Sequence, residues 1–173
     1  MNWEDAKAFC EWISKKEGRI YRLPTDEEWS VAVGLGRKER RSRSDTPESL
    51  SFKVKEYPWG AEWPPPAGVG NFSDQSRKEK APSDSGDYIE GYNDGFPMTA
   101  PVMSFAPNRF GLFDMEGNVR ELVEDWYNGT EERRVVRGGS WLNEKVYSSS
   151  RLGILPTERV LHQPGFRLVL ETQ

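Results

Sequence analysis

Apolar residues recur every three to four positions along the first part of the chain, which predicts an amphipathic helix over residues 2–16. Asn2 can cap the start of this helix, and Gly18 stands where a left-handed residue commonly ends one. The apolar stripe consists of Trp3, Ala6, Phe9, Cys10 and Ile13. Because Cys10 belongs to this stripe, we expect a buried small side chain there rather than a reactive thiol.

A second helix is predicted a few residues later. Residues 19–23 alternate apolar and polar side chains, as a short strand does. Thr25 and Glu28 then match a capping box, in which the hydroxyl accepts from the Glu28 amide and the carboxylate reaches back. The helix therefore starts at Thr25, and Gly34 and Gly36 end it.

The rest of the chain shows shorter periodic segments between long polar stretches. Residues 121–127 are predicted as a short helix or strand, residues 134–137 as a strand, and residues 165–170 as a closing strand. Residues 71–101 show no periodicity, which inside a compact domain indicates a functional or disordered segment. Two helices followed by short strands and much irregular loop predict an α+β fold.

The composition mainly excludes certain classes of function. The 173 residues carry a net charge of −4, which argues against generic nucleic-acid binding, and we interpret the basic run at residues 37–43 as a solvated loop. No apolar run reaches the roughly 18 residues of a membrane-spanning helix. The length fits one domain, and the helix that begins at once suggests that an upstream segment is missing.

Cys10 and His162 are the only cysteine and the only histidine. This excludes an intrachain disulfide, a Cys/His zinc site, a two-thiolate copper site and an iron site that needs two histidines. The lack of disulfides fits the cytosol without requiring it, so the compartment stays undetermined.

Oxygen-bearing and backbone-permissive residues are concentrated in residues 107–121. Asp114, Asn118 and Glu121 place three oxygen ligands within eight residues, beside glycines that allow tight or left-handed turns. A loop pinned by apolar side chains, with its oxygens turned inward, can hold Ca²⁺ without an EF-hand. The pattern fits equally a buried turn whose polar groups only satisfy the backbone. The residues themselves leave both interpretations open.

Short motifs follow one another over nearly the whole chain. The most specific are Tyr57-Pro58-Trp59-Gly60, Asp94-Gly95-Phe96, Phe110-Gly111-Leu112-Phe113-Asp114-Met115, Gly117-Asn118-Val119, Val136-Arg137-Gly138-Gly139-Ser140-Trp141 and Gly165-Phe166-Arg167. In this order they resemble the sulfatase-modifying-factor family, whose founding member is formylglycine-generating enzyme. The resemblance implies a single C-type-lectin-like α+β domain over residues 1–173, with two N-terminal helices, short antiparallel strands and much loop, but without the family's usual N-terminal strands.

The resemblance also implies two structural Ca²⁺ sites, each of which would fasten a long loop to the core. At the first site the family uses the side chains matching Asp114 and Glu121 and the carbonyl oxygens matching Gly117 and Val119. At the second site it uses the side chains matching Asn71 and Asp94 and the carbonyl oxygens matching Phe72 and Phe96. Four protein oxygens plus waters suffice for the coordination of Ca²⁺.

For catalysis the resemblance implies a loss. Formylglycine-generating enzyme binds Cu(I) through two cysteines that follow its Gly-Gly-Ser motif, and it oxidises a substrate cysteine. Here Asn143 and Ser148 stand at those two positions, and an amide and a hydroxyl cannot hold Cu(I) as thiolates do, so no copper is expected. Ser140 matches the family's oxygen-site serine but has no metal to serve.

We therefore expect a non-catalytic, calcium-stabilised binding or regulatory module, a pseudoenzyme whose ligand is a protein, peptide or glycan. The expected ligand-binding residues are Ser140, Trp141, Asn143, Tyr147, Ser148, Ser149 and Arg151, whose polar and aromatic side chains suit adaptable recognition. An ordinary surface loop is the simpler reading of this segment.

Three other functions stay open. One is a formylglycine-generating-type oxidase that acts on a protein cysteine. Another is an enzyme that uses a serine at residues 148–150 with His162 as base, although nothing in the spacing brings them together. The third is a regulatory or scaffold domain within a larger multidomain protein.

Overall fold

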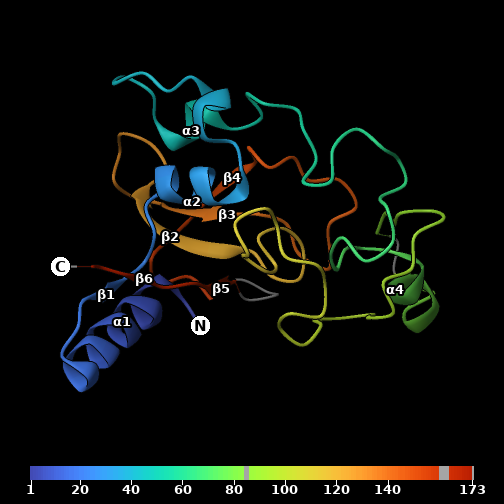
Figure 1. Cartoon of the computed structure of the whole chain (residues 1–173), viewed down its shortest axis with the longest axis horizontal. Coiled ribbons are helices and arrows are strands. Elements are labelled where there is room, and N and C mark those ends of the chain that lie inside the picture. The colour runs from blue at the N-terminus through green and yellow to red at the C-terminus, as the bar shows by residue number, and fades with distance from the viewer. Residues whose placement is uncertain (84–85, 160–163, 173) are drawn as a thin grey trace.

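The chain folds into helices, two small sheets and long irregular loops, and the computed structural model describes residues 1–83, 86–159 and 164–172 (Figure 1). The helices are α1 (Trp3–Glu17), α2 (Asp26–Val33), the 3₁₀ helix η1 (Gly36–Glu39), α3 (Pro47–Leu50) and α4 (Gln75–Lys80). The strands are β1 (Tyr21–Arg22), β2 (Glu121–Trp126), β3 (Arg134–Arg137), β4 (Arg151–Ile154), β5 (Gly165–Phe166) and β6 (Val169–Leu170). This mixture is the α+β class that the sequence predicts.

Local capping sets the two N-terminal helices, as predicted. The Asn2 side chain accepts from the Asp5 amide at 2.8 Å at the start of α1, and Gly18 ends the helix with φ +64°. Thr25 accepts from the Glu28 amide at 3.1 Å at the start of α2. Both predicted helices are confirmed.

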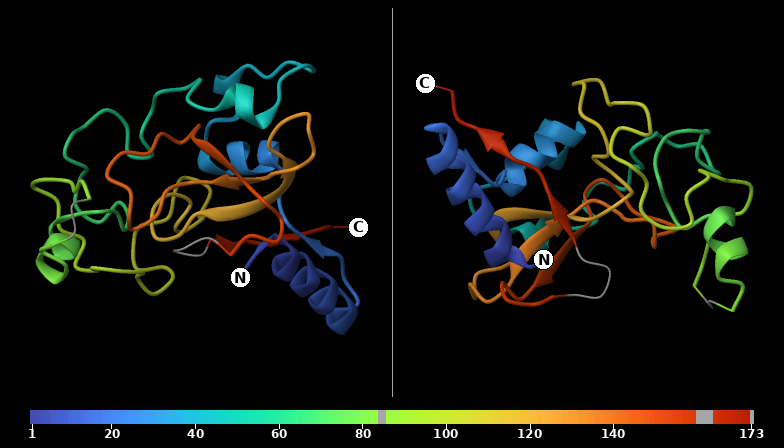
Figure 2. Two further views of the ribbon diagram at one scale, coloured as in Figure 1. Left: turned by 180° about the vertical axis from the view of Figure 1, so that it is seen from behind. Right: turned by 90° about the horizontal axis from the view of Figure 1, so that it is seen from below.

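A four-stranded sheet in the order β4-β3-β2-β5 lies at the centre of the packed part of the molecule. The pairs β2·β3 and β3·β4 are antiparallel, as expected, whereas β5 runs parallel to β2. A separate antiparallel pair joins β1 to β6, which brings the first and last strands together beside α1 (Figure 2). Helix α2 covers the sheet on the other side (Figure 1).

The single closing strand predicted over residues 165–170 is wrong. Gly165 and Phe166 pair with β2, whereas Val169 and Leu170 pair with β1, so one stretch of sequence serves two sheets. Arg167 between them turns its guanidinium toward Glu121 instead of continuing the ladder. Strand β4, which the sequence did not predict, forms the edge beyond β3.

The basic run at residues 37–43 is only partly the solvated loop that its composition suggests. Glu39 within it is fully buried, and Arg41 forms ion pairs with Glu39 and Asp26. The buried carboxylates attract the run onto α2, because a buried charge must be paired.

The core consists of separate apolar clusters. One lies between α1 and the sheet and includes Leu122, Val136 and Cys10, whose side chain is buried as predicted. A second packs Trp29 of α2 on the sheet's other face. A third, centred on Phe72, lies under the long loops away from the sheet. No helix within the described ranges is long and apolar enough to cross a membrane.

Candidate functional site

The segment 107–121, which carries the predicted oxygen ligands, contains several residues with left-handed backbone and packs closely against residue 71. The residues with positive φ are Gly111, Asp114, Gly117 and Asn118. A Cβ atom at Gly117 would lie 2.6 Å from the carbonyl oxygen of Asn71, so only glycine fits there. The amide of Asn118 donates to the same carbonyl oxygen at 2.7 Å. Segment 107–121 is therefore fastened to residue 71.

Asn118 serves the backbone in this docked loop. Its side-chain oxygen accepts from the Ala100 amide at 2.9 Å, and its side-chain nitrogen donates to the Ala100 carbonyl at 3.2 Å. Both polar atoms of this buried amide are satisfied within the protein. Asn118 therefore fits the interpretation of the segment as a buried turn.

The first predicted calcium site comprises Asp114, Gly117, Val119 and Glu121. Asp114, Val119 and Glu121 do line one open cavity of about 560 Å³. The carboxylate of Glu121, however, accepts two hydrogen bonds from Arg167, at 2.5 and 2.6 Å, and a third from the indole of Trp29 at 2.8 Å. A guanidinium thus already neutralises the main acid, and a calcium ion would meet its positive charge. The fit of these residues to Ca²⁺ is incomplete.

The second predicted site comprises Asn71, Phe72, Asp94 and Phe96. The Asp94 carboxylate accepts from the amides of Phe72 and Phe96 at 2.9 and 2.8 Å, so the structure brings the four residues together. Burial raises the pKa of Asp94 to about 6, and the negative charge of nearby Asp74 adds to the effect. No ion pair to this carboxylate occurs among the described residues.

An unsatisfied oxygen lies in the same place. The Asn71 side chain donates to the Met98 carbonyl at 2.6 Å, which fixes its orientation, and its buried Oδ1 has no hydrogen-bond partner within the described ranges. A buried unpartnered amide oxygen, on the residue before the Phe72 amide that binds the Asp94 carboxylate, fits a hard cation. No cluster of three or more His, Cys, Asp or Glu side chains occurs in the described part of the chain, so any metal here would depend on backbone and amide oxygens as well.

The resemblance matches Asn143 to the first copper-binding cysteine and Ser148 to the second or its neighbour, and both residues have structural roles here. The Asn143 side-chain oxygen accepts from the Ser140 amide and hydroxyl, both at 3.0 Å, and closes a turn. Ser148 is buried, its amide donates to the Glu56 carbonyl at 3.0 Å, and its carbonyl accepts from Arg137 at 3.0 Å. Neither position offers a soft ligand for Cu(I).

Part of the predicted recognition surface lies inside the protein. Ser149 is fully buried and exchanges two hydrogen bonds with the backbone of Val54. The Arg151 side chain is fully buried and pairs with Asp26, as does Arg137. The structure therefore places Ser149 and Arg151 in the interior and not on a recognition surface, because they satisfy buried charges and backbone groups.

Trp141 and Tyr147 are half-buried and remain within reach of a ligand. Tyr147 stacks on Tyr57 with ring centroids 5.1 Å apart, and Tyr57 stacks on Trp59 at the same distance. Trp63 completes this aromatic cluster and is 41% exposed. The sequence singled out the turn that carries Tyr57 and Trp59 but did not join it to Tyr147. His162, the base of the alternative serine mechanism, lies outside the described residues.

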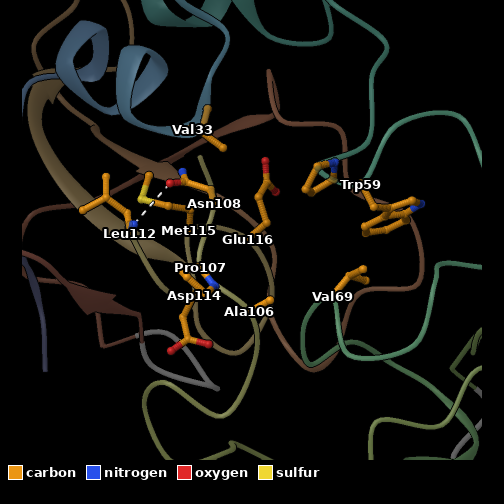
Figure 3. Close-up of a pocket in the computed structure, with 11 residues that line it drawn as sticks. Val33, Trp59, Val69, Ala106, Pro107, Asn108, Leu112, Asp114, Met115 and Glu116 are labelled. Carbon is orange, nitrogen blue, oxygen red and sulfur yellow. Dashed lines mark hydrogen bonds between the residues drawn. The ribbon is translucent and has the colours of Figure 1, made fainter. Parts of the chain in front are cut away.

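A cavity of about 190 Å³ beside this aromatic cluster was not predicted (Figure 3). It lies between segment 107–121 and the loop that carries Trp59, with Val33 of α2 on one side. The side chain of Glu116 is directed into it. Burial raises the pKa of Glu116 to about 7, although nearby Ser148 and Arg137 act to lower it. The sequence does not single out Glu116, because the property that marks it is the lack of a hydrogen-bond partner within the described ranges, which only the structure reveals.

Comparison with known proteins gives one consistent family. The model of the sulfatase-modifying factor enzyme 1-like domain matches residues 1–172. The chain is 31% identical over 176 residues to the protein named inactive C-alpha-formylglycine-generating enzyme 2 of Bos taurus, covering 96% of this chain and 48% of that protein. It is 32% identical over 162 residues to formylglycine-generating enzyme of Mus musculus, covering 85% of this chain and 36% of that protein.

The fold agrees with a solved structure of the same kind. PvdO from Pseudomonas aeruginosa superposes with a TM-score of 0.66 and 25% sequence identity, over 99% of this chain and 60% of that one. The chain thus spans about half or less of the length of the curated relatives described above. The relatives to which it is similar in sequence include both a named inactive form and a named enzyme.

Proposed function

Since the chain belongs to the sulfatase-modifying factor enzyme 1-like family, we propose that it is a non-catalytic, calcium-stabilised binding or regulatory module on that family's fold. The observation that carries the proposal is the role of Asn143 and Ser148. Where the resembled enzyme needs two thiolates, this chain has an amide that closes a turn and a buried hydroxyl residue that holds Arg137 through its carbonyl. The relative named as an inactive enzyme supports the same reading.

The proposed calcium ion would be held by Asn71 and Asp94, with the carbonyl oxygens of Phe72 and Phe96. The unpartnered Asn71 oxygen and the raised pKa of Asp94 support this assignment. There the ion would supply positive charge that fastens the long loop to the core, and it would take part in no reaction. At the first site Arg167 fills the same electrostatic role beside Glu121, so calcium is not needed to neutralise that carboxylate.

The proposed ligand-binding face is the aromatic cluster with its neighbours. Tyr147 belongs to this cluster, and half-buried Trp141 lies in the turn that Ser140 and Asn143 close a few residues earlier in the chain. Aromatic rings and short polar side chains suit a protein, peptide or glycan.

The direct test is for oxidase activity. The protein, its folded state verified by its melting transition, is incubated with Cu(I), oxygen and a cysteine-containing sulfatase peptide, and the peptide is assayed for aldehyde. We expect none, while an active formylglycine-generating relative converts the same peptide. Aldehyde production would overturn the non-catalytic proposal and favour an oxidase that acts on a protein cysteine.

A further inference from the structure

The cavity beside the aromatic cluster ends in a carboxylate that the fold does not use. Glu116 is only 5% exposed, and both of its carboxylate oxygens are buried without a hydrogen-bond partner in the described ranges. Leaving a buried carboxylate unpaired costs several kcal/mol. The fold therefore either loses stability by keeping this carboxylate, or another molecule supplies hydrogen-bond donors to it.

The neighbouring side chains leave both oxygens open. The Ser148 hydroxyl lies beside Glu116 and lowers its pKa, although neither carboxylate oxygen forms a hydrogen bond of good geometry within the described residues. The terminal nitrogens of Arg137 donate to Asp26, Ser30 and Ser148, so its guanidinium cannot turn toward Glu116 without breaking those bonds, and its Nε is buried without a partner in the described ranges.

Arg120 is the other neighbouring cation, and its Nη1 donates to the Gly138 carbonyl at 3.1 Å. Within the cavity itself, the side chain of Asn108 is hydrogen-bonded to the backbone of Ala32 and Leu112. No described residue is hydrogen-bonded to Glu116, so its open oxygens are available to donors from a bound molecule.

The side chains that line the cavity indicate what kind of molecule supplies hydrogen-bond donors to Glu116. Val33, Val69, Leu112 and Met115 give the cavity an apolar lining, and Trp59 adds an aromatic side chain (Figure 3). Trp59 is held in place by its stacking on Tyr57 and by a 2.9 Å bond from its indole to the Glu62 carbonyl. Such walls favour an organic body over a metal ion, which would require several oxygen ligands. Aromatic rings also attract cations through their faces.

The volume of the cavity and the charge of Glu116 restrict the class of ligand further. A cavity of about 150 Å³ holds benzene in other proteins, so about 190 Å³ accepts a group of similar or slightly larger size. A primary ammonium is compact and carries three donors, which matches a carboxylate with two open oxygens.

We propose that this cavity binds a primary alkylammonium group, with the ammonium on Glu116 and the carbon chain against the apolar walls and Trp59. The group could be carried by a free small amine or by the side chain of a peptide lysine, which is the same chemistry. This inference rests on the proposed binding function, whose ligand class it specifies.

The test is titration calorimetry at pH 8 in the presence of Ca²⁺, with butylammonium as the probe and butanol as its neutral counterpart. We expect saturable binding of butylammonium that is at least tenfold tighter than any binding of butanol. Glu116→Gln keeps the shape of the side chain and should weaken butylammonium binding at least tenfold. The matched control Glu11→Gln removes one exposed carboxylate from α1 and should bind as the unaltered protein does.

Two further arms complete the design. A short peptide with one internal lysine that binds more tightly than butylammonium would identify a peptide as the source, and binding of butylammonium alone would identify a small amine. Trp59→Leu should weaken binding of either probe. Absence of saturable binding, or equal binding by a folded Glu116→Gln variant, would overturn the proposal. These outcomes are independent of the aldehyde assay, so a failure here is distinct from a failure of the non-catalytic proposal.

Discussion

Asp26 shows how one side chain can organise a buried region. It is fully buried at the start of α2 and pairs with Arg41, Arg137 and Arg151. Burial by itself raises the pKa of Asp26, but Arg137 and Arg151 outweigh it and lower the pKa to about 2, from an ordinary value of 3.8. The ionised carboxylate therefore stabilises the folded state.

This predicts a specific loss of stability in acid. Because the folded pKa is depressed, the contribution is present above pH 4 and is lost as the pH falls through about 2, at a cost of about 2 kcal/mol. Urea unfolding between pH 5 and pH 2 measures it.

Asp26→Asn serves as the comparison. It should destabilise the protein by roughly 3–5 kcal/mol near neutral pH, because buried Arg137 loses its charged partner and buried Arg151 keeps only Glu39. The variant should also lose this part of the acid dependence. An unchanged acid dependence in the variant would contradict the role assigned to Asp26.

At the scale of elements, the docking of segment 107–121 on residue 71 can be tested with two glycines of the same conformation. Gly117 has φ +80° and a Cβ there would lie 2.6 Å from a backbone oxygen, whereas Gly111 has φ +77° and open space around it. Gly111→Ala should cost about 1–2 kcal/mol for the left-handed backbone alone. Gly117→Ala should cost at least about 1 kcal/mol more, since the backbone of the loop must also move. Equal free energies of unfolding for the two variants would show that the loop is not held at Gly117.

The elements that depend on neighbouring residues were the ones the sequence predicted well. Caps at Asn2 and Thr25 and apolar periodicity place α1 and α2 to within a residue or two, because those signals act within one turn. The strands at the end of the chain were harder to predict from the sequence. Which sheet Gly165 or Leu170 joins depends on partners more than forty residues away, at Glu121 and Tyr21.

The candidate site shows the same limit. Family motifs single out Asn71 and Asp94, and the structure brings the Asp94 carboxylate to the amide that follows Asn71. The motifs cannot show that Arg151 is buried by Asp26, because that ion pair joins residues 125 positions apart. Nor can they show that Glu116 has no partner, since this depends on where the donors of Arg137 and Arg120 are directed.

At the scale of the whole molecule, the long loops are far from the sheet and depend on the cluster around Phe72 and on the proposed calcium ion. A ligand at 100 times its dissociation constant stabilises the folded state by about 2.7 kcal/mol. Addition of Ca²⁺ after chelation should therefore raise the melting temperature by roughly 5–10 °C for a domain of this size.

The matched variants for this experiment are Asp94→Asn and Asp87→Asn. The first removes the negative charge of a proposed ligand and should strongly reduce the shift, whereas the second removes an exposed carboxylate from the same loop region and should retain it. An undiminished shift in Asp94→Asn would locate the calcium elsewhere.

The pairing of β1 with β6 has a consequence for how the protein is made. Tyr21 pairs with Leu170, and Arg22 forms an ion pair with Glu171, so β1 pairs with a strand that is synthesised some 150 residues later. During translation, β1 therefore has no strand partner until residues 169–171 have left the ribosome. In a nascent chain stalled before residue 165, the segment of β1 should be more sensitive to protease than in the released protein.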